Sequence, residues 1–116
     1  MTPYLSVIIP AYNEEDNLNR GTLDVAVAYL EKQPYPWEIV LVNDGSSDKT
    51  AEILKDFAQY QKHVRFIDNP HQGKAQTVIT GVLAAQGEII LFSDMDQATP
   101  ITEFDKFLPK FEEGAD

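Results

Sequence analysis

Four short apolar runs alternate along the chain with segments of helical periodicity. The runs comprise residues 5–9, 38–42, 64–67 and 88–92. Most positions within each run are apolar, whereas a strand with one solvated face would be apolar at every second position only. Continuous apolar character is typical of strands that are buried on both faces, as in a parallel sheet. The pattern therefore predicts four buried strands.

Segments with helical spacing follow these runs. One helix is predicted from Glu14 to Leu30, because its first residues are acidic and the prolines of Gln33–Trp37 end it. Ser46 or Ser47 is predicted to cap the second helix, with Asp48 in its first turn. In the second predicted helix the apolar positions are Ile53, Leu54, Phe57 and Ala58. In the third they are Ala75, Val78, Ile79, Val82 and Leu83. In the last they are Phe104, Phe107, Leu108 and Phe111. This alternation predicts an α/β fold, with helices on both faces of a mostly parallel sheet.

A polar cluster follows each predicted strand. The clusters read PAYNE, NDGSSD, NPHQGK and SDMDQAT, beginning at residues 10, 43, 69 and 93. In parallel α/β sheets, ligands bind beyond the carboxyl ends of the strands. We therefore expect the four clusters to meet at one edge of the sheet and to form the functional site.

Composition narrows the classes of function. A chain of 116 residues is long enough for one domain, and its net charge of −10 argues against nucleic acid as a partner. The same charge means that a phosphate ligand would need a locally basic pocket or a bridging cation. The chain has no cysteine, so disulfides and thiolate metal sites are excluded. It shows neither a signal-peptide pattern nor an apolar run of about 20 residues, which predicts a cytoplasmic location.

Asp94 and Asp96 end the last apolar run on either side of Met95. In an extended segment, side chains two residues apart point to the same face, so the two carboxylates would lie together. Paired carboxylate oxygens suit Mg²⁺ or Mn²⁺, and such a cation can also bridge to a diphosphate. The plainer interpretation is a polar turn in which one aspartate caps the next helix.

Other candidate residues lie in the preceding clusters. Asp44 can accept an N–H from the edge of a uracil or guanine base, Tyr12 offers a flat wall, and Glu14 can accept a hydroxyl. Lys74 follows Gly73 at a predicted helix start, which suits a phosphate or sugar oxygen. Each has a plainer interpretation as loop or capping chemistry. The two histidines, His63 and His71, are predicted to be ordinary loop residues.

In combination and in this order, the motifs resemble the family 2 glycosyltransferases. The resemblance rests on residues 10–14, 42–50, 73–74 and 94–96 and covers nearly the whole chain. It is greatest to the polyprenyl-phosphate sugar transferases, such as the dolichyl-phosphate mannosyl- and glucosyltransferases. It implies a Rossmann-like GT-A fold, with residues 1–116 forming the part that binds a nucleotide-diphosphate sugar such as a UDP- or GDP-sugar. The acceptor half, with the catalytic base, would lie beyond Asp116.

The resemblance also implies roles for single residues. The residues expected to contact the nucleotide sugar are Pro10, Ala11, Tyr12, Glu14, Asp44, Lys74, Asp94 and Met95. Asp94 and Asp96 would hold Mg²⁺ or Mn²⁺, which stabilises the leaving diphosphate. Transfer to the acceptor, a polyprenyl phosphate or a saccharide, would proceed with inversion. The full-length protein would then work at the cytoplasmic face of a membrane.

Two other functions remain open at this stage. Asp94 resembles the nucleophile of a haloacid-dehalogenase-type phosphatase, although Ala98 stands where that motif has Thr or Val. Alternatively, the chain is a non-catalytic nucleotide-binding module, because it holds donor chemistry without an acceptor site. An unpaired sheet edge beyond the last strand also predicts self-association.

Overall fold

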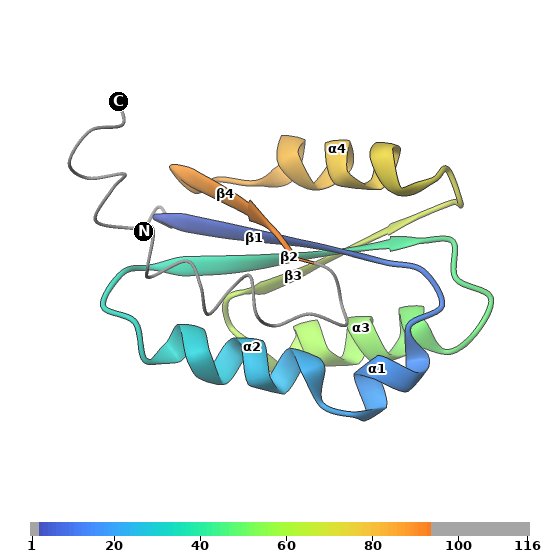
Figure 1. The fold of residues 1–116 in the computed structure, drawn as a ribbon, viewed down its shortest axis with the longest axis horizontal. Coiled ribbons are helices and arrows are strands. Elements are labelled where there is room, and N and C mark those ends of the chain that lie inside the picture. The colour runs from blue at the N-terminus through green and yellow to red at the C-terminus, as the bar shows by residue number, and fades with distance from the viewer. Residues whose placement is uncertain (1–2, 94–116) are drawn as a thin grey trace.

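The computed structural model describes residues 3–93, which form a parallel sheet with helices on both faces (Figure 1). The strands are β1 (Leu5–Ala11), β2 (Trp37–Asp44), β3 (Val64–Asn69) and β4 (Ile89–Phe92). Their order in the sheet is β3-β2-β1-β4, and every neighbouring pair is parallel. The predicted fold class is therefore confirmed, and each apolar run forms the strand that its pattern predicts.

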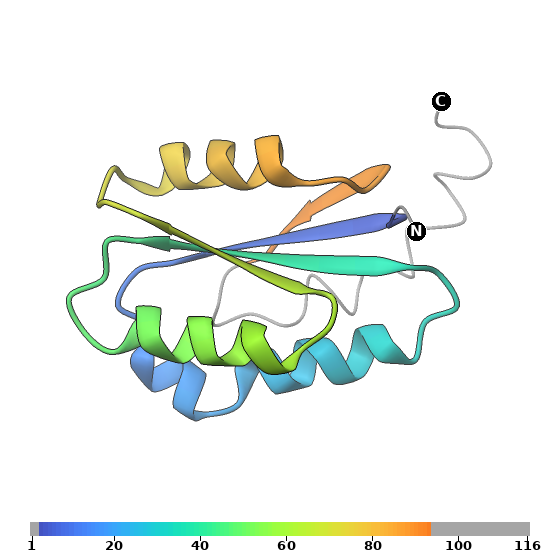
Figure 2. The same ribbon diagram turned by 180° about the vertical axis from the view of Figure 1, so that it is seen from behind.

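Helices cover the two faces unequally. The elements α1 (Glu15–Asn19), α2 (Thr22–Glu31) and α3 (Thr50–Tyr60) lie on one face, and α4 (Lys74–Ala84) lies on the other. The view from behind shows the same division into three layers (Figure 2). No helix within residues 3–93 is long and apolar enough to cross a membrane.

The core divides along the two faces of the sheet. Alternate strand residues such as Val7 and Ile39 pack with Leu30 of α2 and Leu54 of α3, and all four are fully buried. The intervening positions, Ile8, Val40 and Val42, form a smaller cluster on the α4 side. Burial on both faces explains why the strands are continuously apolar.

The prediction of one helix over residues 14–30 is wrong. The structure has two helices there, α1 and α2, separated by Arg20 and Gly21. Gly21 has a φ of 82°, a left-handed conformation that ends α1 and redirects the chain. The Thr22 hydroxyl donates a hydrogen bond of 3.1 Å to the carbonyl oxygen of Asn17, which fixes the angle between the helices.

The predicted cap of α3 is also wrong. The helix begins at Thr50, and Lys49 takes the N-cap position without a side-chain hydrogen bond. Asp48 precedes the helix and accepts hydrogen bonds from the N–H and the hydroxyl of Thr50. Ser46 and Ser47 instead bind the loop after β1, as described below.

One buried acid ties the loop after α4 to the sheet. Glu38 of β2 is only 6% exposed and accepts hydrogen bonds from the Ser6 hydroxyl at 2.6 Å and the Gln86 N–H at 2.7 Å. Its other oxygen lies 2.9 Å from the Arg65 guanidinium. Every polar atom of Glu38 is therefore satisfied, which a buried carboxylate requires.

Candidate functional site

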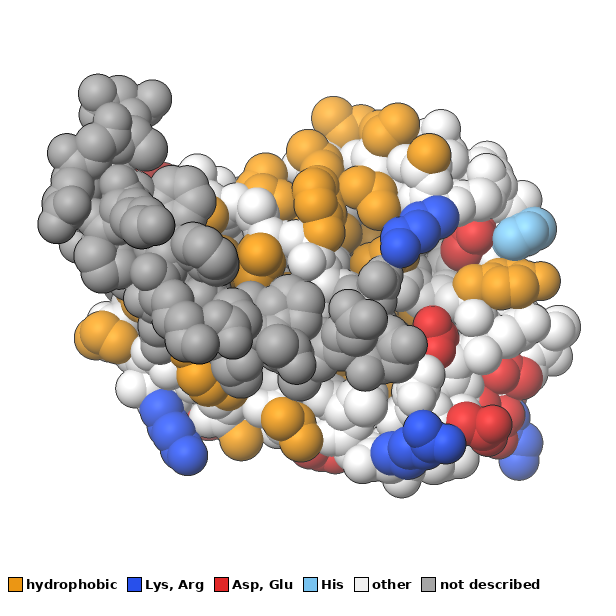
Figure 3. Space-filling view, viewed as in Figure 1, with side chains coloured by type: hydrophobic (Ala, Val, Ile, Leu, Met, Phe, Trp, Pro, Cys, Tyr) orange, Lys and Arg blue, Asp and Glu red, His pale blue; other side chains and the backbone are white. Residues whose placement is uncertain are grey.

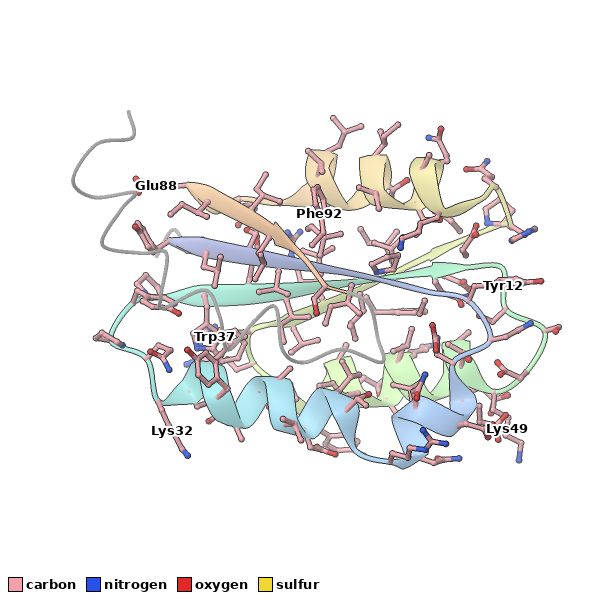
Figure 4. The ribbon with its side chains drawn as sticks, in the orientation of Figure 1. Tyr12, Lys32, Trp37, Lys49, Glu88 and Phe92 are labelled. Atoms are coloured by element: carbon pink, nitrogen blue, oxygen red, sulfur yellow. The ribbon has the colours of Figure 1, made fainter. Side chains whose placement is uncertain are left out.

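A cleft of about 240 Å³ opens at the carboxyl ends of β1, β2 and β3. It is lined by Pro10, Ala11, Tyr12, Glu14, Asp44, His71, Gly73, Lys74 and Thr77. Six of the eight residues predicted to contact a nucleotide sugar are among them, and Asp94 and Met95 lie outside the described residues. Figure 4 places Tyr12 at this end of the sheet, whereas Trp37, at the start of β2, lies at the opposite end. The polar clusters after these three strands thus converge, as their positions predict.

The loop after β1 is held by the loop after β2. Asn13 has a φ of 53°, and its side-chain oxygen accepts the N–H of Ser47 at 2.8 Å. The N–H of Asn13 donates to the Ser46 hydroxyl at 3.0 Å, and the N–H of Glu14 donates to the Thr50 hydroxyl at 2.8 Å. These hydrogen bonds join the two loops and so position Tyr12 and Glu14 at the cleft.

Asp44 is the buried acid of the cleft, with 4% of its surface exposed. One carboxylate oxygen accepts the N–H of Gln72 at 2.7 Å, and the other accepts the N–H of Gly73 at 3.2 Å. Burial opposes the ionisation of Asp44, but these N–H groups, His71 and the Thr77 hydroxyl outweigh it and lower the pKa of the carboxyl. Asp44 is therefore a carboxylate at neutral pH, directed at the loop that leads into α4.

Gly45 allows the loops after β2 and β3 to touch. A Cβ atom at this position would lie 2.3 Å from the backbone nitrogen of His71 and 2.8 Å from its Cα. Gly45 also has a φ of 62°, in the left-handed region. Only glycine meets both requirements without strain. The glycine of the NDG motif thus brings the backbone of residue 71 against the end of β2.

His71 lies in the loop between β3 and α4, as predicted, but it also lines the cleft, which was not predicted. Its ring stacks on Tyr12, with ring centroids 4.4 Å apart and an angle of 29° between the ring planes. Its Nδ1 lies 3.1 Å from a carboxylate oxygen of Asp44. The sequence contains one signal for a place at the cleft, because His71 belongs to a polar cluster directly after a strand. His71 is predicted as an ordinary loop residue because neither histidine has a partner at metal-ligand spacing.

The start of α4 supplies a positive end to the cleft. Gly73 is the N-cap residue and Lys74 is the first residue of the helix. A helix N-terminus carries a partial positive charge and attracts anions. Thr77, which is 1% exposed, donates a hydrogen bond of 2.8 Å to the carbonyl oxygen of Gly73 and so stabilises this first turn. A threonine inside a helix carries no distinctive signal, so the place of Thr77 in the cleft could not be predicted from the sequence.

The predicted metal ligands, Asp94 and Asp96, lie outside the described residues. Within residues 3–93, no group of three or more His, Cys, Asp or Glu side chains is placed to hold a metal ion. The strand that leads to the aspartates is described: Phe92 of β4 pairs with Ile8, and the N–H of Ser93 donates to the carbonyl oxygen of Ile8. Since β4 is parallel to β1, the carboxyl ends of both strands lie at the same edge of the sheet.

The surface at the cleft end carries side chains of both charges. In Figure 3, acidic, basic and histidine side chains gather at the end of the molecule where Figure 4 labels Tyr12. Apolar side chains gather instead over α4 and β4, where Leu83 is 81% exposed and Phe92 is 49% exposed. The two surfaces therefore differ in chemistry, and the polar one surrounds the cleft.

Comparison with known proteins identifies relatives over nearly the whole chain. The family described as Glycosyl transferase family 2 matches residues 6–116. A dolichyl-phosphate beta-glucosyltransferase of Trichomonas vaginalis is 40% identical over 107 residues, which are 87% of this chain and 32% of that protein. An undecaprenyl-phosphate 4-deoxy-4-formamido-L-arabinose transferase of Edwardsiella ictaluri is 33% identical over 115 residues, which are 97% of this chain and 35% of that protein. The chain thus spans about a third of the length of these relatives.

Solved structures share the fold. Residues 1–349 of TarS from S. aureus match with a TM-score of 0.69 at 24% identity, over 94% of this chain and 33% of that one. The mannosyltransferase PcManGT from Pyrobaculum calidifontis, solved in complex with GDP-Man and Mn²⁺, matches with a TM-score of 0.61 at 26% identity, over 83% of this chain and 28% of that one. These matches support the predicted GT-A arrangement of strands and helices.

Proposed function

The chain belongs to glycosyl transferase family 2, and from this membership we propose that residues 1–116 are the nucleotide-sugar-binding part of a glycosyltransferase. The observation that carries the proposal is the cleft itself: three separate strand ends bring six predicted contact residues together around about 240 Å³. Ligand pockets usually measure about 300–1,000 Å³. The described cleft is smaller than this, so we infer that it holds only the base and ribose of a nucleotide sugar. The diphosphate and the sugar would extend beyond it.

Each wall of the cleft has a distinct task in this proposal. Tyr12 provides a flat surface for the base, and the buried Asp44 carboxylate accepts an imino N–H, which uracil and guanine have and cytosine and adenine lack. Glu14 lies at the cleft with its carboxylate accepting the Asn17 amide at 2.8 Å, and it retains acceptor capacity for a ribose hydroxyl. Lys74 and the N-terminus of α4 attract the phosphates.

Asp94 and Asp96 hold a divalent cation, Mg²⁺ or Mn²⁺, in this proposal. Two carboxylates are the ligand set that these hard cations prefer, and the similar PcManGT was solved with Mn²⁺ and GDP-Man. A bound cation would supply charge stabilisation for the departing nucleoside diphosphate. Inverting transfer then forms a bond from an acceptor oxygen to the anomeric carbon while the bond to the diphosphate oxygen breaks.

The acceptor is a polyprenyl phosphate in this proposal. Two relatives that are 40% and 41% identical are named dolichyl-phosphate beta-glucosyltransferases, and another, 33% identical, is named an undecaprenyl-phosphate transferase. Lipid-linked acceptors are held in a membrane, so the full-length protein would work at the cytoplasmic membrane face. No residue within 3–93 is assigned as the catalytic base, and the family match leaves the phosphatase interpretation without support.

Calorimetric titration of the 116-residue chain tests the proposal. We expect UDP or GDP to bind in the presence of Mn²⁺ and to bind much more weakly after chelation. The corresponding nucleosides, which lack phosphates, should bind with an affinity that is independent of Mn²⁺. The double variant Asp94→Asn, Asp96→Asn should abolish the metal effect, whereas Asp24→Asn on the exposed side of α2 should not change it. A folded sample that binds neither diphosphate would overturn the proposal.

A non-catalytic nucleotide-binding module is the second candidate. It is favoured by the observation that the chain spans about a third of its relatives' length. A radiochemical assay with a UDP- or GDP-sugar and a short polyprenyl phosphate separates the two. Sugar transfer or donor hydrolysis by the 116 residues would exclude the module, and nucleotide binding without either reaction would favour it.

A further inference from the structure

His71 lies where the loops after three strands meet. Its ring contacts Tyr12 from the loop after β1, its Nδ1 contacts Asp44 at the end of β2, and its backbone lies against Gly45. We propose that His71 is a positioning and specificity-determining residue, which orients the Asp44 carboxylate so that the cleft selects bases with an imino N–H. This inference rests on the proposed function, because it assumes that the cleft binds a nucleotide.

Hydrogen bonding fixes which His71 nitrogen carries a proton. Nδ1 lies 3.1 Å from a carboxylate oxygen of Asp44 and 3.1 Å from the carbonyl oxygen of the same residue. Both of these atoms are acceptors only, so Nδ1 must be the protonated nitrogen in order to bond to either. His71 therefore acts as a side-chain donor to Asp44, and its ring orientation is set by the end of β2.

Neighbouring donors leave the Asp44 carboxylate little freedom. An ionised carboxylate offers about four acceptor positions. In Asp44 two of these positions receive the N–H groups of Gln72 and Gly73, and the Nδ1 of His71, which donates to the Asp44 carbonyl oxygen, lies 3.1 Å from the carboxylate. Gly73 binds Oδ2, which is also the oxygen nearest the His71 ring, whereas Gln72 binds Oδ1. With the Thr77 hydroxyl as a further neighbour, this arrangement restrains the carboxylate plane. The two backbone N–H groups leave acceptor capacity on the carboxylate, to which an N–H of a base can bond.

The stacked pair of Tyr12 and His71 makes this arrangement part of the cleft wall. Both side chains line the cleft, Tyr12 is 46% exposed, and the centroid distance of 4.4 Å leaves no room for a base between the rings. A base must therefore bind against one side of the pair. Stacking fixes the Tyr12 ring as well as the His71 ring, so the flat wall and the acceptor keep a constant spacing.

Two substitutions separate the two contacts of His71. His71→Phe keeps an aromatic ring for Tyr12 and removes the donor to Asp44, whereas His71→Asn keeps an N–H donor and removes the ring. We would titrate UDP, GDP, CDP and ADP into each variant of the 116-residue chain with Mn²⁺ present. The matched control is His63→Asn, because His63 packs edge-on against Trp37 at the opposite end of the sheet.

We expect the wild-type chain to bind UDP or GDP at least about tenfold more tightly than CDP and ADP, since one hydrogen bond to a charged group is worth that factor. His71→Phe should reduce this preference to about threefold or less. His71→Asn should retain the preference while its affinity for every nucleotide falls severalfold. The His63→Asn control should match the wild type in both respects.

The outcomes distinguish this inference from the proposed function. If the wild-type chain binds none of the four nucleotides, the proposed function fails and the inference fails with it. If the wild-type chain binds and His71→Phe keeps the full preference, the proposed function stands and the inference is overturned. Loss of preference in His71→Asn with retention in His71→Phe would overturn it as well, because the donor would then have no part in selection. Thermal unfolding of each variant establishes that the compared samples are folded.

Discussion

The close approach of Gly45 to His71 makes Gly45→Ala a severe test of the cleft. The added Cβ would lie 2.3 Å from a backbone nitrogen, whereas ordinary contacts begin near 3.4 Å, so the loop at residue 71 must retreat by about 1 Å. The left-handed φ of 62° costs alanine a further ~1–2 kcal/mol. Because a backbone atom cannot turn aside as a side chain can, we expect a total loss of about 3–4 kcal/mol of unfolding free energy.

Gly21→Ala is the matched control for Gly45→Ala. Gly21 has a φ of 82°, and its added Cβ would meet only the Asp24 carboxylate, at an ordinary 3.7 Å. This variant carries the conformational cost without the clash, so we expect a loss of only ~1–2 kcal/mol. Urea unfolding measures both values, and calorimetry should show weaker UDP or GDP binding for Gly45→Ala alone. Equal losses of stability in the two variants would refute the reasoning, since the approach of residue 71 would then have no energetic effect.

Three further predictions concern stability. Glu38→Gln should lower the free energy of unfolding by about 2–3 kcal/mol, because it removes the charge that faces Arg65 from a buried network. In the same urea-unfolding assay, the control Glu52→Gln on the exposed side of α3 should change this free energy by less than ~0.5 kcal/mol. Similar losses in the two variants would contradict the role of the network. Asn13→Ala should lower the free energy of unfolding by ~2 kcal/mol, because a residue with left-handed backbone loses its hydrogen bond to the neighbouring loop. Asn13→Gly should lower it less in the same assay, because glycine adopts this backbone conformation without strain. A larger loss for glycine than for alanine would show that the backbone of residue 13 is not strained. The lowered pKa values of Asp44 and Asp48 mean that both carboxylates stabilise the fold fully above their unfolded pKa of 3.8 and lose this contribution as the pH falls through their folded pKa values. When urea unfolding is measured between pH ~5 and ~2, the free energy of unfolding should therefore decline less for Asp44→Asn than for the wild type. An equal decline in the two would contradict this assignment.

The strands could be predicted from sequence because burial on both faces leaves a strong signal. All of the residues in β2 are buried, including Glu38, whose charge is neutralised by its network rather than by solvent. The break at Gly21 could not be predicted from periodicity, because Leu18 of α1 and Leu23 of α2 both face the core and the apolar spacing continues across the break. The boundary between α1 and α2 depends on the left-handed backbone conformation of Gly21, which leaves no trace in the spacing of apolar residues.

The candidate site shows a similar division. Convergence of the clusters followed from the parallel direction of the strands, and it brought Tyr12, Asp44 and Lys74 to one cleft. Contacts between clusters could not be predicted, because they join residues far apart in sequence. Ser46 would make a plausible helix cap on local grounds, yet it donates a hydrogen bond to the Asn43 side chain at 2.6 Å and accepts one from the loop after β1. The contacts of His71 with Tyr12 and Asp44 could not be predicted for the same reason, because these partners follow or end two other strands.

The charges of the cleft explain why the proposed nucleotide site needs a cation. Its described lining contains two acids, Glu14 and Asp44, and one lysine, Lys74. The N-terminus of α4 adds about half a positive charge. A nucleoside diphosphate brings at least two negative charges to a chain whose net charge is already −10. The N–H groups of Gln72 and Gly73 partly offset the charge of Asp44, but no surplus of positive charge remains to hold the phosphates. A divalent ion between the Asp94–Asp96 pair and the diphosphate would supply the missing charge, so the acidity of this chain favours the proposed cation over direct binding by basic side chains.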